Sequence, residues 1–386
     1  PTFIVANTFK GRGIRGAKQS QNGYHTISSC PKELVREAIK NIKPNVIFSR
    51  PFIDSLKREA IKDNFEILIN IPPNVSNLED ATDIYLKYLE NELAWKDRRL
   101  YIMTADLVDK TYSDSLLVHE STSFLDVGIR EQHLFAMAHG LSQTDNRARI
   151  WLHSGDSFLY RCSDQLNAIA QSRTPMIIIG DRPGLCGGKN GPTHQSSGQP
   201  GLILNMHGIC FKEPADVEDL CNCLNEAVST NLGPTYVRLH SSNIEALLSK
   251  EKKNTSNYVV MQNGKIPNII IVGSGLALKY VVPAARALKD EGISTKVINV
   301  LDPKSLDDKF IQRLHGAVPV LTLYNGNPFV LSSAVSNALM KYNITRPSKI
   351  VAHGFEHGTS GSIEDLLKRY RFDKQGITEL VRGVLK

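Results

Sequence analysis

The sequence lacks the features that mark membrane-spanning, zinc-finger and nucleic-acid-binding proteins. No apolar run is long enough to cross a bilayer, and no charged-then-apolar leader opens the chain. The six cysteines form no CxxC pair, which argues against a zinc site or a disulfide framework and favours a reducing cytoplasm. The formal net charge is +7, but the basic residues are scattered and no basic stripe alternates with aromatic residues. We therefore expect no membrane and no nucleic-acid partner, and we ascribe the positive charge to attraction of anionic small molecules.

The chain shows neither internal repeats nor low-complexity tracts, and its 386 residues are enough for two or three domains. Apolar, β-branched segments alternate with amphipathic helical segments, which predicts α/β domains built on doubly wound, mostly parallel sheets. The predicted strands of the first unit are residues 99–105, 175–181 and 234–240, after a helix over 78–94. A second unit begins near Tyr258, with strands over 268–275, 294–300 and 319–325 and a helix over 279–292.

A glycine pair in the second unit, Gly273-Ser274-Gly275, could hold a phosphate. A third glycine at the dinucleotide-binding spacing is absent from the sequence, so we favour a tight turn between a strand and a helix.

The most informative segment is FLDVGIREQHLFAMAHGL, residues 124–141. A strand here leads into a helix whose Leu134, Phe135, Ala138 and Leu141 share one face. Glu131 then falls in the first helical turn, at the carboxyl edge of a sheet, where open α/β folds bind ligands. An acidic residue at a helix start usually complements the helix dipole, so this position alone is weak support for catalysis.

Several motifs together resemble the transketolase and 1-deoxy-D-xylulose 5-phosphate synthase family. The strongest are GIREQH at 128–133 and GPTHQ at 191–195, and SFLYRCSDQ followed by a strand and Asp-Arg-x-Gly resembles the synthases. The opening PTFIVANTFKGRG, with His25 after it, looks like the last strand and histidine loop of the family's diphosphate-binding domain. The resemblance implies thiamine diphosphate and Mg²⁺ as cofactors.

Roles for individual residues follow from this resemblance. Glu131 would hydrogen-bond the cofactor's pyrimidine ring and activate it, while Phe158 would stack on that ring and Arg161 would join the cofactor site. His194 and His25 would move protons at substrate oxygens near neutral pH. The remaining candidates would bind substrate: Lys110, Arg182, Asn190 and Ser241.

The chain departs from the family pattern at three points. It lacks the Gly-Asp-Gly…Asn motif that holds the Mg-diphosphate, and Gly155-Asp156-Ser157 is a false match because it lies just before Phe158. Asn190 stands where transketolases carry an aspartate, and Ser241 stands where relatives carry a phosphate-binding arginine. Losing that arginine removes a strong charge-assisted contact, which Lys110 or Arg182 could replace.

Because this motif is missing, we expect the cofactor to be anchored by another polypeptide or by a missing amino-terminal portion. We favour the first, a split enzyme, and we expect no metal ligand from this chain. Its partner would be an amino-terminal subunit that carries the diphosphate-binding domain, in a dimer of heterodimers. The expected organisation is a tail of the diphosphate-binding domain (1–30), a connector (31–77), a pyrimidine-binding domain (78–255) and a C-terminal domain (256–386), the last serving subunit packing.

Three functions remain open. The first is transfer of a two-carbon ketol unit from a ketose to an aldehyde, with a sugar or sugar phosphate as substrate. The second is a decarboxylating carboligation of a 2-oxoacid, as in the synthases, which SFLYRCSDQ and Arg182 favour. The third is a non-catalytic subunit that stabilises a partner, which the presence of both Glu131 and His194 argues against.

Overall fold

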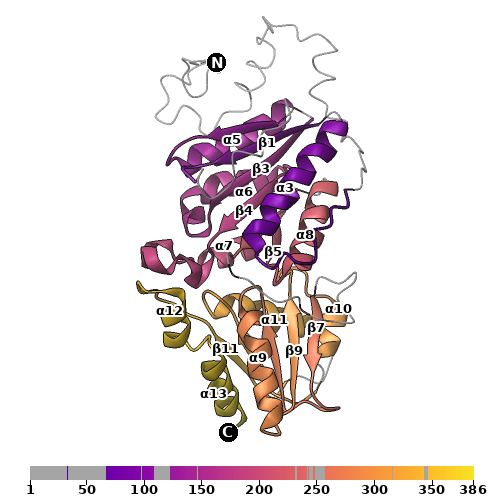
Figure 1. The fold of residues 1–386 in the computed structure, drawn as a ribbon, viewed down its shortest axis with the longest axis vertical. Coiled ribbons are helices and arrows are strands. Elements are labelled where there is room, and N and C mark those ends of the chain that lie inside the picture. The colour runs from indigo at the N-terminus through magenta and orange to yellow at the C-terminus, as the bar shows by residue number, and fades with distance from the viewer. Residues whose placement is uncertain are drawn as a thin grey trace, which may run out of the picture. The chain divides into compact units, whose positions relative to one another are not determined.

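The computed structural model describes residues 67–107, 122–240 and 257–386, apart from residues 97, 146, 231–232, 315 and 343–346, together with the single positions 33, 242 and 247. From residue 67 onward the described residues belong to one compact unit, Asn64–Lys386. Two sheets carry this unit, each with helices packed against it (Figure 1). The predicted opening strand and most of the predicted connector lie outside the described residues.

The first sheet has six strands in the order β2-β1-β3-β4-β6-β5, and all of its pairings are parallel. Its strands are β1 (Arg99–Thr104), β2 (Thr122–Asp126), β3 (Ala148–Gly155), β4 (Ile177–Asp181), β5 (Cys210–Lys212) and β6 (Thr235–Leu239). Its helices are α3 (Leu78–Trp95), α5 (Glu131–Thr144), α6 (Ser163–Gln171), α7 (Gln199–Asn205) and α8 (Val217–Ser229). Three 3₁₀ turns connect them: η3 (Asp156–Cys162), η4 (Gly184–Asn190) and η5 (Pro192–His194).

Alternation along the strands divides the core of this sheet into two layers. Ile150 and Leu152 of β3 face the cluster formed with α5, α6 and α7. Trp151, between them, faces the opposite cluster, formed with α3 and α8. Because successive side chains of a strand point to opposite faces, both faces of a parallel sheet must be covered. The predicted doubly wound fold is therefore confirmed.

The second sheet has the order β11-β10-β8-β9-β7, and only the β7–β9 pair is antiparallel. Its strands are β7 (Asn257–Gln262), β8 (Ile269–Gly273), β9 (Thr295–Val300), β10 (Val320–Leu323) and β11 (Ile350–His353). Its helices are α9 (Ala277–Asp290), α10 (Asp308–Arg313), α11 (Phe329–Lys341), α12 (Ile363–Arg369) and α13 (Lys374–Leu385).

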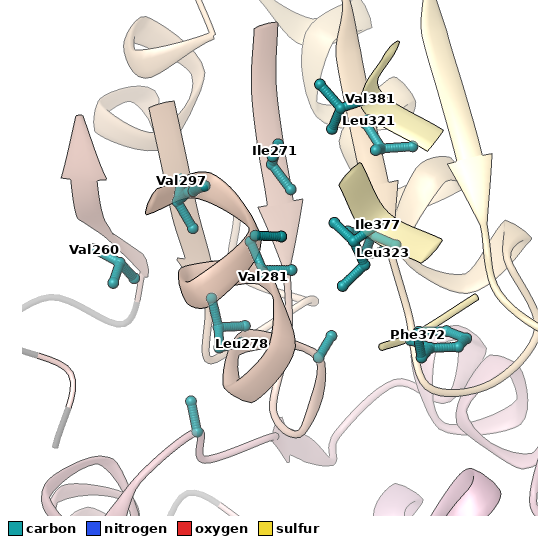
Figure 2. Close-up of a cluster of buried hydrophobic side chains, with 14 of the residues drawn as sticks. Val260, Ile271, Leu278, Val281, Val297, Leu321, Leu323, Phe372, Ile377 and Val381 are labelled. Atoms are coloured by element: carbon teal, nitrogen blue, oxygen red, sulfur yellow. The ribbon is translucent and has the colours of Figure 1, made fainter. Parts of the chain in front are cut away.

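One face of this second sheet is covered by α9, α12 and α13, and the other by α10 and α11. Figure 2 shows Val281 of α9 beside Ile271 of β8, and Ile377 and Val381 of α13 near the side chains of β10. The predicted crossover from β8 through α9 to β9 is confirmed, and Gly275 adopts a φ of +52° in the turn before α9. That left-handed φ suits glycine, so this segment is the tight turn favoured from the sequence.

None of the described helices is both long enough and apolar enough to cross a membrane.

Candidate active site

Glu131 lies where the sequence predicts, at the first residue of α5. The segment between β2 and α5 is shaped by Asp126, whose carboxylate accepts hydrogen bonds from the amides of Asp106 and Gly128, both at 2.9 Å. Gly128 itself has a φ of +67°, a conformation that favours glycine. This turn places Glu131 at the carboxyl edge of the first sheet, where only 5% of the residue is exposed.

A single charged partner contacts the Glu131 carboxylate among the ion pairs of the described residues. The Arg161 guanidinium lies 3.1 Å from Glu131 Oε1, and the Arg161 side chain is 54% exposed. The guanidinium carbon also lies 4.7 Å from the centre of the Phe158 ring, a cation–π contact. Burial next to Glu131 raises the pKa of the Cys162 thiol to about 12, so this cysteine stays protonated at neutral pH.

His194 completes this group from a different part of the chain. Its ring lies edge-on to Phe158, with centroids 5.3 Å apart and an interplanar angle of 76°. The Thr193 hydroxyl lies 3.0 Å from His194 Nδ1. The structure therefore brings together four predicted site residues, Glu131, Arg161, Phe158 and His194, which are spread over more than sixty positions of sequence.

Two further candidates lie on the same edge of the sheet but outside this chain of contacts. Arg182 follows β4 with a φ of +50°, and its Nε lies 2.8 Å from Asp181 Oδ2. A non-glycine residue at such a φ is uncommon and is a reason to examine the position for function. Asn190 is exposed at the end of η4.

Three predicted site residues, His25, Lys110 and Ser241, lie outside the described residues.

The loop that carries His194 is buried to a degree that the sequence does not suggest. Its glycines and polar residues predict a loop excluded from the core, whereas Gly187, Gly188, Gln195 and Ser196 are buried. A Cβ at Gly187 would lie 1.9 Å from the His194 carbonyl oxygen, so only glycine allows this close approach of backbone. The loop is polar because its partners are backbone groups and buried polar side chains.

The sequence does not predict a buried polar cluster that lies next to this site. Asp156, fully buried, accepts hydrogen bonds from Ser196 and Tyr236 and pairs with Arg238, whose Nε lies 3.0 Å away. Arg238 also pairs with Glu213. The one sequence signal was a charged residue inside the apolar strand PTYVRLH, since an arginine there must find buried partners.

With this geometry established, comparison with known proteins identifies the family. The description "transketolase, pyrimidine binding domain" matches residues 84–246, and "transketolase, C-terminal domain" matches residues 258–377. This chain belongs to the transketolase family. The two matched regions are the pyrimidine-binding region (84–246) and the C-terminal region (258–377).

Curated relatives come from both branches of the family. A 1-deoxy-D-xylulose-5-phosphate synthase from Crocosphaera subtropica is 26% identical over 90% of this chain and 50% of its own length. A transketolase from Homo sapiens is 24% identical over 100% of this chain and 62% of its own length. The chain thus spans about half to three-fifths of the curated relatives that it matches.

Solved structures share the fold. Transketolase from Campylobacter jejuni aligns with a TM-score of 0.70 and 18% identity, over 96% of this chain and 61% of the other. A structure described as a split gene transketolase, an inactive β4 tetramer, aligns with a TM-score of 0.64 and 22% identity, over 80% of this chain and 98% of the other. The split gene structure is therefore matched over nearly all of its own length, whereas a fifth of the present chain lies outside the match.

The residues of the site fit the ring end of thiamine diphosphate, the cofactor of this family. A buried carboxylate, Glu131, can bond a ring nitrogen, and Phe158 offers an aromatic face on which a cationic, planar guanidinium already lies. Among the described residues, groups of three or more His, Cys, Asp or Glu side chains that could hold a metal ion are absent.

Proposed function

We propose that this chain is a subunit of a thiamine-diphosphate-dependent transferase that moves a two-carbon ketol unit from a ketose to an aldehyde. The observation that carries the proposal is the contiguous group of Glu131, Arg161, Phe158 and His194 at the carboxyl edge of the first sheet. Family membership supports the reaction class, since both transketolases and deoxyxylulose-phosphate synthases are among the relatives.

Each residue of this group has a distinct part in the proposal. When bound, thiamine diphosphate supplies the nucleophilic carbon that attacks the donor carbonyl. Glu131 holds the pyrimidine ring and controls its protonation, while Phe158 and Arg161 position the ring. His194 exchanges a proton with the substrate hydroxyl next to the bond that breaks, a task suited to an imidazole near neutral pH.

The outer contacts to substrate are also part of the proposal. Arg182, held by Asp181, and Asn190 at the loop tip would contact the substrate, together with Lys110, Ser241 and the proton-transfer residue His25. The proposed domains are the tail of the diphosphate-binding domain (1–30), the connector (31–77), the pyrimidine-binding domain (78–255) and the C-terminal domain (256–386).

The partner in this proposal is an amino-terminal subunit that binds Mg²⁺ and the diphosphate, in a cytoplasmic dimer of heterodimers. Two observations support it. The sequence lacks the family's Gly-Asp-Gly…Asn motif, and the chain covers 98% of a structure described as a split gene transketolase tetramer that is inactive.

A second candidate is a decarboxylating carboligase of the deoxyxylulose-phosphate synthase kind. The identity of 26% to such a synthase, the SFLYRCSDQ segment and the Asp-Arg-x-Gly position of Arg182 favour it. The two reactions release different products. Incubation of the complex with a ketose releases an aldehyde in the first case, whereas incubation with a 2-oxoacid releases carbon dioxide in the second. A complex that does neither, yet depends on this chain for assembly, would support a non-catalytic subunit.

Replacing Glu131 by glutamine tests the central assignment. We expect E131Q to lower kcat by at least about 100-fold, because general acid–base groups contribute factors of that size, and to leave assembly of the complex intact. The matched control is E92Q, since Glu92 is an exposed glutamate on α3. Unchanged turnover in E131Q would refute the role of Glu131.

A further inference from the structure

The hydroxyl of Ser196 connects three separate parts of the proposed active site. It donates to Asp156, which lies two residues before Phe158, and Ser196 itself lies two residues after His194. It also accepts a hydrogen bond from the amide of Gly184 at 2.8 Å. A single buried hydroxyl thus joins both ends of the His194 loop to η3, the turn that carries Phe158.

Arg238 contacts both members of the Ser196–Asp156 pair, which we call the junction. Its Nε contacts Asp156 at 3.0 Å, and its Nη2 lies 3.4 Å from the Ser196 hydroxyl. The same side chain donates from Nη1 to the Tyr324 hydroxyl at 2.8 Å and from Nη2 to the Asn325 carbonyl at 3.2 Å. Arg238 therefore connects the junction to residues that follow β10, in the C-terminal region.

The carboxamide of Asn325 hydrogen-bonds the backbone at the start of the same loop. Its Oδ1 accepts from the amide of Leu185 at 3.0 Å, and its Nδ2 donates to the carbonyl of Pro183 at 3.1 Å. Two further contacts fasten the loop's far end. The amide of Asn327 donates to the Ser197 carbonyl at 2.7 Å, and Gln195 Nε2 donates to the Thr359 carbonyl at 2.9 Å.

The electrostatics of the cluster make this arrangement hard to deform. Asp156, Glu213 and Arg238 are all at least 95% buried, and buried charges are tolerated only when paired and hydrogen-bonded. Moving Arg238 or Asp156 would leave an uncompensated charge in a low-dielectric interior. The position of Ser196, and with it the loop, is thereby tied to a rigid charged centre.

We propose that Ser196, Asp156, Arg238 and Asn325 are positioning residues that hold the His194 ring against Phe158, and that the C-terminal region thereby sets the geometry of proton transfer. The proposal rests on the function proposed above for His194. It gives the C-terminal region a part in catalysis beyond subunit packing, although none of its described residues joins the group of Glu131, Arg161, Phe158 and His194.

The first test measures the loop itself, in the full chain and without substrate. In S196A, amide hydrogen exchange of peptides spanning residues 184–198 should accelerate by about tenfold or more, because loss of a local anchor raises the population of open loop. The control is Y258F, which removes a buried hydroxyl bonded to Asp219 at 3.0 and 2.9 Å in a separate polar cluster. We expect Y258F to leave loop exchange unchanged.

The second test measures catalysis in the reconstituted complex. We expect S196A to displace His194 by up to about 1 Å, which should lower kcat by about 10- to 100-fold. The KM for the ketose should stay within about threefold of the wild-type value. N325A, a substitution in the C-terminal region, should likewise lower kcat and leave KM nearly unchanged. It serves as the second variant if S196A does not fold.

These outcomes separate the two proposals. Unchanged loop exchange in S196A and N325A, or faster exchange with unchanged kcat, would overturn the positioning role. A wild-type complex without ketol transfer would instead refute the proposed function, while the exchange experiment would still decide whether the C-terminal region holds the loop.

Discussion

At the residue scale, the start of α3 holds two carboxyl groups with raised pKa values. Burial, followed by the negative charge of Asp181, raises the pKa of Glu79 to about 7. Burial, followed by the charge of Asp80, raises the pKa of Asp83 to about 6. Both groups bind a proton more tightly in the folded protein than in the unfolded chain. The stability that these two groups contribute is therefore fully present below their unfolded pKa values and is lost as pH rises through the folded ones.

Replacing Glu79 by glutamine should reduce this pH dependence. At about pH 8 the wild-type residue carries a charge that the fold disfavours, so E79Q should raise the free energy of unfolding by about 1 kcal/mol after allowance for solvent screening. At about pH 4 both proteins should unfold alike, because Glu79 is then protonated in both states. Urea unfolding at the two pH values measures the difference. E92Q, on an exposed position of the same helix, is the control, and an equal gain there would contradict the assignment to Glu79.

At the scale of elements, the site is built from two strand-to-helix connections and one long loop. The connection after β2 places Glu131 at the start of α5, and η3, directly after β3, places Phe158. The loop that contains η4 and η5 places Asn190 and His194. The position of Glu131 depends on a local turn. The loop depends on close packing of backbone against backbone, which is why its glycines matter.

Gly187 offers a direct test of that packing. In G187A the added Cβ would lie 1.9 Å from the His194 carbonyl oxygen, so the loop must shift. We expect a loss of about 1–3 kcal/mol in the free energy of unfolding and a fall in kcat, measured by chemical denaturation and by turnover of the complex.

The control for this substitution lies at the other end of the chain. Gly383 is on α13, and a Cβ there would meet nothing within 4 Å. Because alanine favours a helix more than glycine, G383A should raise stability by up to about 1 kcal/mol without affecting turnover. If both substitutions cost the same, the close contact at Gly187 does not constrain the loop.

At the scale of the whole molecule, the proposed function assigns the chain a carboxylate and an aromatic face for the cofactor ring. The Gly-Asp-Gly…Asn motif for its diphosphate is missing from the sequence. In the proposed split enzyme, the partner subunit would therefore supply most of the binding free energy, because phosphates are held by charge-assisted bonds and metal ions.

We therefore expect the purified chain to bind thiamine diphosphate only weakly in the presence of Mg²⁺, with Kd lowered at least about 100-fold on addition of the amino-terminal subunit. Isothermal titration calorimetry measures both values, and sedimentation velocity should show the mass of two chains of each kind. Tight binding by the isolated chain would contradict the shared site.

Local features of the fold and of the site could be predicted from the sequence. The alternation of strands and helices, the turn at Gly275 and the place of Glu131 at a helix start depend on periodicity and turn chemistry, which neighbouring residues determine. Strand β3 was not among the predicted strands, because its end, His153 to Gly155, is polar although buried.

Only the tertiary structure decided which distant residues meet. Asp156, Ser196, Arg238 and Asn325 come from four segments, and strand order together with packing of the two regions sets their contacts. Sequence patterns report which face of an element is buried, but they carry no signal for the partner of a buried charge. The sequence alone therefore determined the family and the position of the carboxylate, whereas the tertiary structure decided how the histidine loop is held beside it.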